Sequence, residues 1–305
     1  MKKKIVVVGS LNYDIIFKQE RLPSEGETYA VDSAMCCGGG KGANQAVQSA
    51  KLGADVYMVG AVGDDAMGKF LLENLVQYGV NTEYVRTVNS VSGLGVINCL
   101  AEGAVYANIV RGANYEITEK DIDNIDNIID DVEVMILQLE IPVPIVEYAI
   151  DKAYEKGIKI IINAAPAIPI SEKSLKKCDY VIVNEVESSY YCNREINSVE
   201  TAKEAILPFF DKYQANSVFT LGRDGAVLYD GRELLHVEAH KVDAVETTGA
   251  GDSFIGALGY CIVEEMNLLE SAEFATCCSA LTVCNIGAQP SMPTLEEVEK
   301  YKKTR

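Results

Sequence analysis

The sequence predicts an α/β protein, a doubly wound sandwich whose mostly parallel sheet is covered by helices on both faces. Three observations support this prediction. Short runs rich in Val and Ile alternate along the chain with helical patterns, and the helical patterns end in Gly. The short runs are apolar throughout, so both faces of each strand are expected to be buried. Strands that alternate with helices in this way form βαβ units and a parallel sheet.

The elements follow one another in a regular order from the amino terminus. Strands are predicted at 4–9, 55–60, 132–140, 158–164, 179–184 and 217–222. Helices are predicted at 41–53, 66–79 and 144–157, each closed by a Gly that suits a helix carboxyl end. From about residue 250 the chain reads as mostly helical, with a segment at 268–287 that is buried all round and an amphipathic helix at 294–303.

Two stretches depart from this pattern, at residues 14–36 and 91–110. Both alternate apolar and polar residues and contain Gly turns, which is typical of half-exposed antiparallel strands. We therefore expect them to pair in a small second sheet that could serve as a lid. The whole chain, 1–305, is interpreted as one core domain with this excursion.

Composition limits the functions that the chain can have. The 305 residues carry a formal net charge of −18, which disfavours binding to nucleic acid or anionic membranes. Two His, His236 and His240, offer little material for a His-based metal site or a Ser-His-Asp triad. The nine Cys include no C-x-x-C pair and fit reduced thiols. The apolar run after the basic start stops at Gly9, too short for a signal peptide, so we expect a cytoplasmic protein.

The stretch TTGAGDSF, at 247–254, places Asp252 where a helix begins. Glycines before a helix let the backbone approach a ligand, and the N–H groups of the first turn attract an anion. A carboxylate beside such an anion site can accept the proton of an attacking hydroxyl in phosphoryl transfer. The alternative is that Asp252 is simply a helix-capping or first-turn acid, which would stabilise the helix by about 0.5 to 2 kcal/mol. From this motif alone both interpretations remain open.

A second glycine cluster, GGGKGANQA, lies at 38–46. It is not a P-loop, because Gly42 follows Lys41 where Ser or Thr is required. It matches G-x-G-x-x-A with Asp55 further on, as in a dinucleotide site, but the strand expected before it is weak and polar. Lys41 and Asn44, near a helix start, could instead hydrogen-bond a polar substrate.

Polar side chains recur near the predicted strand ends. Asn12 and Asp14 follow the first strand, Glu140 ends the third, and Asn184 and Glu187 follow a later one. In open α/β sheets, ligands bind outside the carboxyl ends of the strands. An amide and a carboxylate two residues apart suit the vicinal hydroxyls of a sugar. The alternative for Asn12 and Asp14 is an Asx-turn that closes the strand.

Together these motifs resemble one known family. The chain is similar to the ribokinase-like (pfkB) carbohydrate kinases in the order and spacing of GSLNYD, GGGKGANQA, VGDD, LQLE, NAAPA, VNEVES, TLGRDG, TTGAGDSF and GAQPSMP. The resemblance spans nearly the whole chain, and the pairing of the two glycine motifs is highly specific. It implies a three-layer α/β/α sandwich with a small β-sheet lid, and transfer of the ATP γ-phosphate to a sugar, with D-ribose phosphorylated at O5 as the expected reaction. It also implies Mg²⁺, K⁺ and a homodimer formed through the lid.

The resemblance further implies roles for individual residues. Asp252 would be the general base, and the anion hole would be the backbone of Gly249, Ala250 and Gly251. The sugar contacts would be Asn12, Asp14, Gly40, Lys41, Asn44 and Glu140. The nucleotide and its magnesium would be held by Asn184, Glu187, Thr220, Gly222, Gly225 and Thr276. The monovalent-cation loop would comprise Glu246, Thr248, Thr282, Asn285, Gly287 and Ser291, mostly through backbone carbonyls.

Three residues depart from the family pattern. Glu246 stands where Asp is usual, which bears on potassium activation. Tyr13 replaces a small residue between two sugar contacts and could narrow or reshape the pocket. Arg111 stands where a neutral residue is common; pointing inward it would favour an anionic sugar, and a solvated side chain is the expected alternative. Asn12 follows the pattern and favours a pentose with its 2-hydroxyl intact, because deoxyribose kinases tend to have an apolar residue there.

Two other functions remain open from the sequence. The chain could be a kinase of another sugar, such as deoxyribose or a fructose-type sugar, or of a nucleoside, and Tyr13 and Arg111 leave room for this. It could also be a sugar-binding regulator that has lost catalysis. Asp252, Asn184 and Glu187 argue against a regulator, since a binding module needs no base beside an anion site.

Overall fold

The main sheet of the protein has nine strands in the order β13-β12-β11-β10-β9-β8-β1-β4-β5. The structure is a computed structural model that describes residues 4–31, 33–100 and 105–303. The nine strands are β1 (Lys4–Val8), β4 (Asp55–Gly63), β5 (Asn81–Val88), β8 (Val132–Gln138), β9 (Lys159–Asn163), β10 (Tyr180–Val183), β11 (Asn216–Thr220), β12 (Ala226–Tyr229) and β13 (Leu234–Val237). Pairing is parallel from β11 to β5 and antiparallel at β12 and β13.

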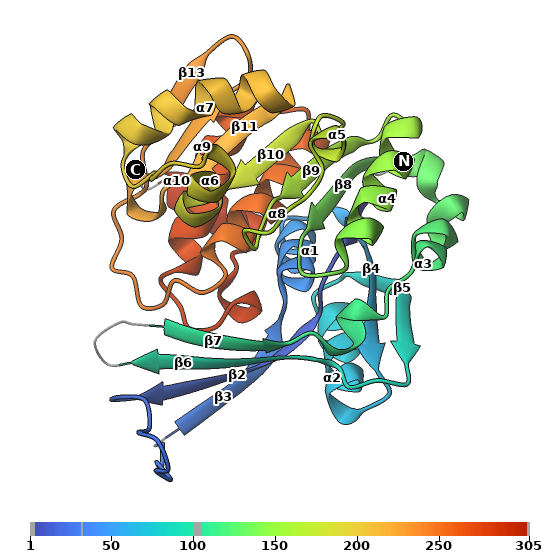
Figure 1. Cartoon of the computed structure of the whole chain (residues 1–305), viewed down its shortest axis with the longest axis vertical. Helices are drawn as coiled ribbons and strands as arrows, with labels where there is room; N and C mark the ends of the chain where they lie inside the picture. Colours follow the sequence, from blue (N-terminus) through green and yellow to red (C-terminus); the bar gives the residue numbers. More distant parts are fainter. Residues whose placement is uncertain (1–3, 32, 101–104, 304–305) are drawn as a thin grey trace.

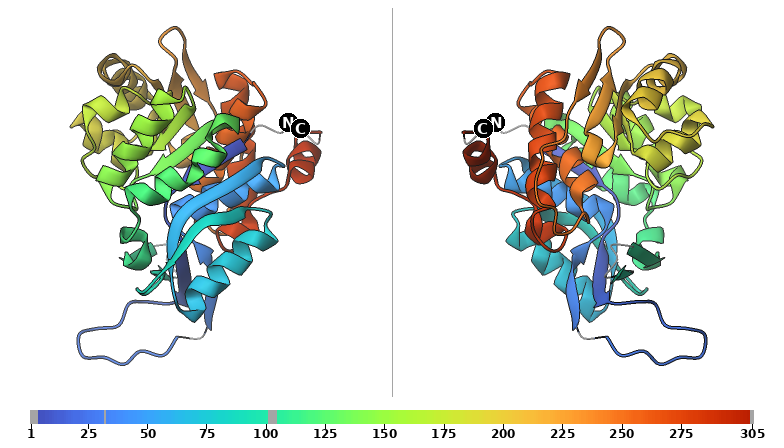
Figure 2. Two further views of the ribbon diagram at one scale, coloured as in Figure 1. Left: turned by 90° about the vertical axis from the view of Figure 1, so that its right-hand side faces the viewer. Right: turned by 90° about the vertical axis from the view of Figure 1, so that its left-hand side faces the viewer.

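Helices cover both faces of this sheet, which gives three layers (Figures 1 and 2). One face is covered by α1 (Lys41–Lys51), α2 (Ala66–Gln77), α8 (Ala250–Val263), α9 (Leu268–Thr282) and α10 (Leu295–Lys303). The other is covered by α3 (Glu119–Asp123), α4 (Val143–Glu155), α5 (Glu172–Leu175), α6 (Glu185–Cys192) and α7 (Val199–Tyr213). Single turns of 3-10 helix are η1 (Gly112–Tyr115), η2 (Asn124–Asn127), η3 (Ile129–Asp131), η4 (Gly222–Asp224) and η5 (Gln289–Ser291). The predicted fold class is confirmed.

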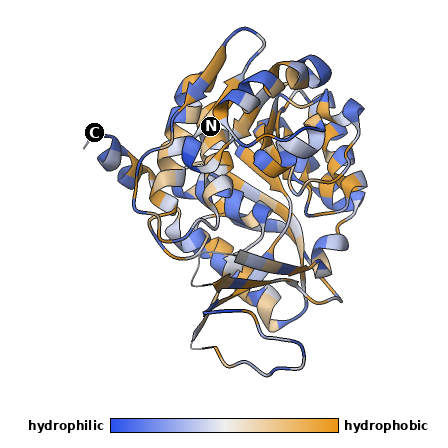
Figure 3. Ribbon diagram, turned by 60° about the vertical axis from the view of Figure 1, so that its left-hand side comes forward, coloured by the Kyte–Doolittle hydropathy of each residue, from blue (hydrophilic) through white to orange (hydrophobic). Residues whose placement is uncertain are grey.

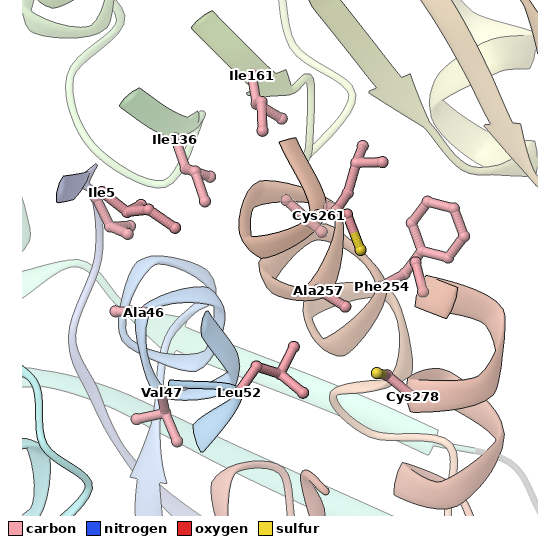
Figure 4. Packing of buried hydrophobic residues seen from close by; sticks show 14 of the residues in the cluster. Ile5, Ala46, Val47, Leu52, Ile136, Ile161, Phe254, Ala257, Cys261 and Cys278 are labelled. Atoms are coloured by element: carbon pink, nitrogen blue, oxygen red, sulfur yellow. The ribbon is translucent and has the colours of Figure 1, made fainter. Parts of the chain in front are cut away.

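The central strands are buried on both faces because their side chains alternate between two apolar layers. In β1, Ile5 and Val7 pack into the layer that holds α1 and α8, whereas Val6 and Val8 pack into the opposite layer. Figure 4 shows Ile5, Ile136 and Ile161, from three neighbouring strands, facing those two helices. Figure 3 shows that the strands of the main sheet consist largely of hydrophobic residues. This double burial explains why the strands read as continuous Val and Ile runs.

A second sheet of four strands, in the order β3-β2-β6-β7, forms the lid, which lies below the main sheet in Figure 1. Its strands are β2 (Asn12–Gln19), β3 (Ser33–Gly39), β6 (Gly93–Leu100) and β7 (Val105–Val110). Of the two predicted stretches, residues 32 and 101–104 lie outside the described residues.

The lid differs from the prediction in its central pairing, because β2 and β6 run parallel. The expectation of antiparallel strands throughout is wrong at this pair. Strands β1 and β5 belong to the same parallel part of the main sheet, and β2 and β6 are the next strands that follow them along the chain. Two strands that leave a parallel sheet at the same edge start in the same direction, which accounts for the parallel pair.

Two alternatives from the sequence are also wrong. Asn12 and Asp14 lie within β2 rather than in an Asx-turn. The segment before the first glycine cluster forms β3, which pairs antiparallel with β2 in the lid. A dinucleotide fingerprint requires a strand of the parallel sheet at this place, so that interpretation fails.

The remaining expectations concern the carboxyl-terminal helices and the cysteines. Helix α9 is buried along most of its length, but Leu269, Glu270 and Glu273 are exposed near its start, so it is not buried all round. The nine Cys all lie in the described part of the chain and form no disulfide there. Among the described residues no helix is long and apolar enough to cross a membrane.

Candidate active site

Asp252 lies in the first turn of α8, buried between that helix and α1. Gly249 precedes the helix with φ of 80°, a left-handed conformation that favours glycine. The carboxylate of Asp252 accepts two hydrogen bonds from α1: Gln45 Nε2 donates to Oδ1 at 2.9 Å, and Asn44 Nδ2 donates to Oδ2 at 2.9 Å. Among the described residues no side chain caps the start of α8, so Asp252 is not its cap. It is an acid of the first turn, and its carboxylate bonds to α1 instead of to its own helix.

Burial and neighbouring charges have opposite effects on the pKa values of Asp252 and Lys41. Burial raises the pKa of Asp252, while the positive charge of Lys41 and the two amide donors act to lower it. Burial likewise acts to lower the pKa of Lys41, but the carboxylates of Asp252, Glu140 and Glu187 outweigh it and the pKa is raised. The site thus holds an ammonium group among three carboxylates, of which Asp252 and Glu187 are buried and Glu140 is half-buried.

A pocket of about 190 Å³ opens beside Asp252. It is lined by Lys41, Asn163, Ala165, Ile182, Asn184, Glu187, Thr220, Gly249, Gly251, Asp252 and Ile255. The first N–H groups of an α-helix have no acceptor within the helix and carry the positive end of its dipole. Here Gly249 and Gly251 expose that end of α8 to the pocket, and a Cβ at Gly251 would meet only open space. The pocket is suited to a phosphate group.

Asn184 and Glu187 combine a structural role with a place in the pocket. Asn184 caps α6, and its Oδ1 accepts from the backbone N–H of Val186 at 2.8 Å and of Glu187 at 3.0 Å. Glu187 Oε2 accepts from the backbone N–H of Asn184 at 2.9 Å, which completes a capping box. Burial raises the pKa of Glu187. The reciprocal bonds fix the Glu187 carboxylate where it faces Lys41.

The predicted sugar contacts lie on the lid and at neighbouring strand ends. Asn12 Oδ1 accepts a hydrogen bond from Asn114 Nδ2 at 2.8 Å. Glu140 Oε2 accepts from Ser10 Oγ at 2.6 Å and from the backbone N–H of Lys41 at 3.1 Å. Ordered partners therefore set the orientation of both side chains.

Gly40 is required by the backbone at the start of α1. Its φ is 87°, and a Cβ there would come within 2.8 Å of the Asn12 backbone nitrogen. The residue thus brings the start of the helix directly against β2, which places Lys41 beside the lid.

Asp14 has a carboxylate oxygen inside the lid that accepts no hydrogen bond within the described residues. Its Oδ1 is buried and has no hydrogen-bond partner among the described residues. A Cβ at Gly39 or at Gly95, on the two flanking strands, would come within 1.9 Å and 2.2 Å of the Asp14 carboxylate oxygens. Burial, with the nearby charges of Glu140 and Asp252, raises the pKa of Asp14 to about 7. Such an oxygen is suited to accept a bond from a buried hydroxyl.

Tyr13 and Arg111 lie apart from the predicted sugar contacts Asn12 and Asp14. Tyr13 alternates with these two residues along β2, so it lies on the other face of the small sheet. Its ring packs edge-on against Phe70 with centroids 5.2 Å apart. Arg111 is exposed and stacks over the Tyr115 ring at 4.5 Å. The position of Tyr13 argues against the expectation that it narrows or reshapes the pocket, and Arg111 has the solvated position that was the alternative.

Three of the residues predicted to hold the nucleotide do not line the pocket. Gly222 and Gly225 form the turn after β11, with φ of 49° and 87°. Gly225 packs tightly, since a Cβ there would come within 1.9 Å of the Val237 carbonyl oxygen. Thr276 is buried within α9, where its Oγ1 donates to the Ala272 carbonyl at 2.7 Å. Of the predicted nucleotide contacts, only Asn184, Glu187 and Thr220 reach the pocket.

The predicted cation loop is assembled from two segments. The backbone N–H of Val245 donates to the Val283 carbonyl at 2.7 Å, and the backbone N–H of Gly287 donates to Glu246 Oε2 at 3.0 Å. Glu246 Oε1 is buried without a partner among the described residues.

The other predicted members of this loop differ in exposure and bonding. Thr282 Oγ1 donates to Ser253 Oγ, and Ser291 Oγ donates to the Ala288 carbonyl. Thr248 is half-buried and Asn285 is exposed. Among the described residues no group of three or more His, Cys, Asp and Glu could hold a metal ion.

Sequence reasoning missed the buried amides around the site, which are Gln45, Gln138, Asn114 and Gln289. One signal was present. Gln45 and Gln48 stand in a helix otherwise rich in Ala and Gly, on its buried side. Buried amides need hydrogen-bond partners, so their presence indicated a polar site beneath α1.

An alcohol that meets Asp252 in this site can lose its proton beside N–H groups that favour an anion, which is what phosphoryl transfer to an alcohol requires. The fold and the site therefore define a small-molecule kinase. A family model described as pfkB family carbohydrate kinase matches residues 2–295. The chain belongs to this family.

Individual relatives agree with this assignment. A ribokinase from Staphylococcus aureus (strain COL) is 33% identical over 303 residues, which cover 98% of this chain and 100% of that protein. A deoxyribokinase from Salmonella typhi is also 33% identical, over 97% of this chain and 98% of that protein. The solved structure of Arabidopsis thaliana ribokinase complexed with ribose and ATP is similar with a TM-score of 0.89, at 32% identity over 98% of both chains.

Asp14→Asn should make the ligand-free protein more stable at pH 8. Because the pKa of Asp14 is raised from 3.8 to about 7, the folded protein binds more protons than the unfolded chain between these values, and wild-type stability should fall as pH rises through this window. The variant lacks this decline and should gain about 2 to 4 kcal/mol at pH 8 and little at pH 4. Urea titrations at both pH values measure the difference. An equal gain in the free energy of unfolding at pH 4 and pH 8 would contradict the raised pKa of Asp14.

Proposed function

We propose that this carbohydrate kinase transfers the γ-phosphate of ATP to O5 of D-ribose, with Asp252 as the general base. The observation that carries the proposal is the position of the Asp252 carboxylate. It is held by two amide donors of α1, at the glycine-lined start of α8 and at the edge of the phosphate-sized pocket. A hydroxyl that enters from the lid side would meet the base and the transferred phosphate together.

The choice between ribose and deoxyribose follows from Asn12. Relatives of both kinds are 33% identical to this chain, so identity does not decide. Because Asn12 Oδ1 already accepts from Asn114, Asn12 would contact the sugar through Nδ2, which can only donate. A 2-hydroxyl supplies the acceptor that this donor needs. A buried donor without an acceptor is costly, so deoxyribose should bind worse.

The nucleotide is proposed to bind as its magnesium complex along Lys41, Asn184, Glu187 and Thr220. The fit rests on a carboxylate in the pocket, since Mg²⁺ is usually held by one or two carboxylates and by the phosphates of the substrate. The ion would neutralise charge on the phosphates. Lys41, fixed among carboxylates, would hold the transferred phosphate by its charge.

Rates with purified protein test the proposal. We expect kcat/KM for ribose to exceed that for deoxyribose, fructose and a nucleoside by at least about ten-fold, with activity lost when EDTA removes Mg²⁺. Asp252→Asn should lower kcat by about 100-fold or more while ribose binding, measured by calorimetry, changes little. A preference for deoxyribose would show that the proposed substrate is wrong. Full activity of the Asp252→Asn variant would show that Asp252 is not the general base. A wild-type protein that binds ribose but does not turn over ATP would indicate a sugar-binding regulator.

We also propose that K⁺ binds between the segments at 245–248 and 282–291. The support is Glu246 Oε1, a buried carboxylate oxygen without a partner among the described residues, which is costly unless a cation neutralises it. At constant ionic strength, KCl should raise kcat/KM about five-fold or more over choline chloride, and Glu246→Gln should lose most of this response. Equal rates of the wild-type protein in the two salts would exclude the cation.

The outer face of the lid is proposed to bind a second copy of the chain. Ile15, Phe17 and Val96 lie on this face half-buried, and Tyr106 and Val110 are 49% and 45% exposed. Apolar side chains that line one exposed face of a sheet favour a self-complementary contact.

Phe17→Glu should therefore halve the molar mass in sedimentation. The control Lys18→Glu, on the inner face of the same strand, should not. A wild-type monomer at micromolar concentration would refute the dimer.

A further inference from the structure

Two chains of amide side chains, all buried except Asn74, converge on the Asp252 carboxylate. In the first, Gln138 Nε2 donates to Gln45 Oε1 at 2.7 Å, and Gln45 Nε2 donates to Asp252 Oδ1 at 2.9 Å. Gln45 Nε2 also lies 3.4 Å from Asn163 Oδ1. This chain links β8, α1, β9 and α8 through side chains alone.

The second chain approaches from the other side. Asn74 Nδ2 donates to Gln289 Oε1 at 2.5 Å, Gln289 Nε2 donates to Asn44 Oδ1 at 3.0 Å, and Asn44 Nδ2 donates to Asp252 Oδ2 at 2.9 Å. The backbone around Gln289 is held in turn by Lys51, whose Nζ donates to the carbonyl oxygens of Gln289, Pro290 and Met292.

The direction of every bond in both chains is set by Asp252. An ionised carboxylate only accepts hydrogen bonds, so Gln45 and Asn44 must each turn their NH₂ group toward it. Their oxygens then face away and require a donor, which Gln138 and Gln289 supply. Turning any one amide over would place two acceptors or two donors against each other. The network is therefore complementary to the charged form of Asp252 and to one orientation of its carboxylate.

We propose that Gln45 and Gln289 are positioning residues that hold the Asp252 carboxylate ionised and aimed at the substrate hydroxyl. The inference rests on the proposed role of Asp252 as general base. Neither glutamine lines the pocket, and their exposed fractions are 0% and 1%, so they act through Asp252 and Asn44 rather than on the substrate. Without them a buried carboxylate would lose donors that offset its burial.

Gln48 provides a matched control for Gln45. Both are fully buried on α1, three residues apart, and both contact α8. Gln48 Oε1 accepts from Ser253 Oγ at 2.8 Å and its Nε2 donates to the Pro293 carbonyl at 3.1 Å, so it has no bond to Asp252. Replacing either by Met removes one buried amide of the same size from the same helix.

The test is the pH dependence of kcat at saturating ribose and MgATP for the wild type, Gln45→Met and Gln48→Met. Loss of a donor raises the pKa of a carboxylate, so Gln45→Met should move the acid limb of the profile up by about one pH unit. We expect its kcat at pH 8 to fall about ten-fold with little change in KM. Gln48→Met should lose comparable stability in urea while its limb stays at the wild-type position. Gln289→Met should show a smaller shift in the same direction.

Other charged groups near Asp252 are common to all these variants. Lys41 lies on α1, Glu140 follows β8, and Asp14 faces the site from the lid. Because none of their side chains bonds to the Gln45 side chain, their titration should contribute equally to each profile. If the acid limb of the profile shifts in Gln45→Met and not in Gln48→Met, the shift would therefore report a changed pKa of Asp252.

An isosteric variant covers the case in which Gln45→Met fails to fold. Gln45→Glu would place two carboxylates together, which must share a proton, and should raise the acid limb by more than one pH unit, whereas Gln48→Glu should not. Profiles of the Gln45 variants that coincide with those of the matched Gln48 variants would overturn the inference. That result would leave the proposed function intact, since ribose turnover and its loss in Asp252→Asn are measured separately.

Discussion

The close contact between α1 and α8 is the constraint on which the site depends. A Cβ at Gly256 of α8 would come within 2.5 Å of the Gln45 carbonyl oxygen, and Ser49 Oγ donates to the Gly256 carbonyl at 2.9 Å. Helices with larger side chains at their contact pack with axes about 8 to 10 Å apart. Glycine permits a closer approach, so Asn44 and Gln45 can reach Asp252 across the interface. The start of this helix also brings Asp252, Gly249 and Gly251 to one pocket.

Glycines elsewhere in the site also make room for polar groups. A Cβ at Gly42 would come within 2.7 Å of the backbone of Gly9 and Ser10, so α1 can begin directly against the end of β1. Gly39 and Gly95 leave space for the Asp14 carboxylate in the lid. In each case glycine, which has no side chain, leaves room for a polar side chain or a backbone segment to approach closely. A larger apolar residue would fill this space. This explains why the functional motifs are rich in glycine.

The sequence predicted the parts of this design that depend on local pattern. Continuous Val and Ile runs identified the strands because burial on both faces leaves no alternation, and the glycine turn before Asp252 identified the helix start. The pairing of β2 with β6 and the outward position of Tyr13 were not predictable, since both depend on register between distant segments. The bond from Gln289 to Asn44 joins residues 245 positions apart. No local signal sets such a contact, although a buried amide indicates that a partner exists.

The small sheet and the surroundings of Asp252 belong to one packed unit. Gly38 in β3 lies against the outer amide chain, where a Cβ would come within 2.6 Å of both Asn74 Nδ2 and Gln289 Oε1. The next residue of the strand, Gly39, lies against the Asp14 carboxylate. A displacement of this strand would therefore disturb both the surroundings of Asp14 and the bonds that orient Asn44 toward Asp252. If Asp14 binds the sugar and Asp252 is the base, as proposed, this shared backbone segment would link sugar binding to the orientation of the base.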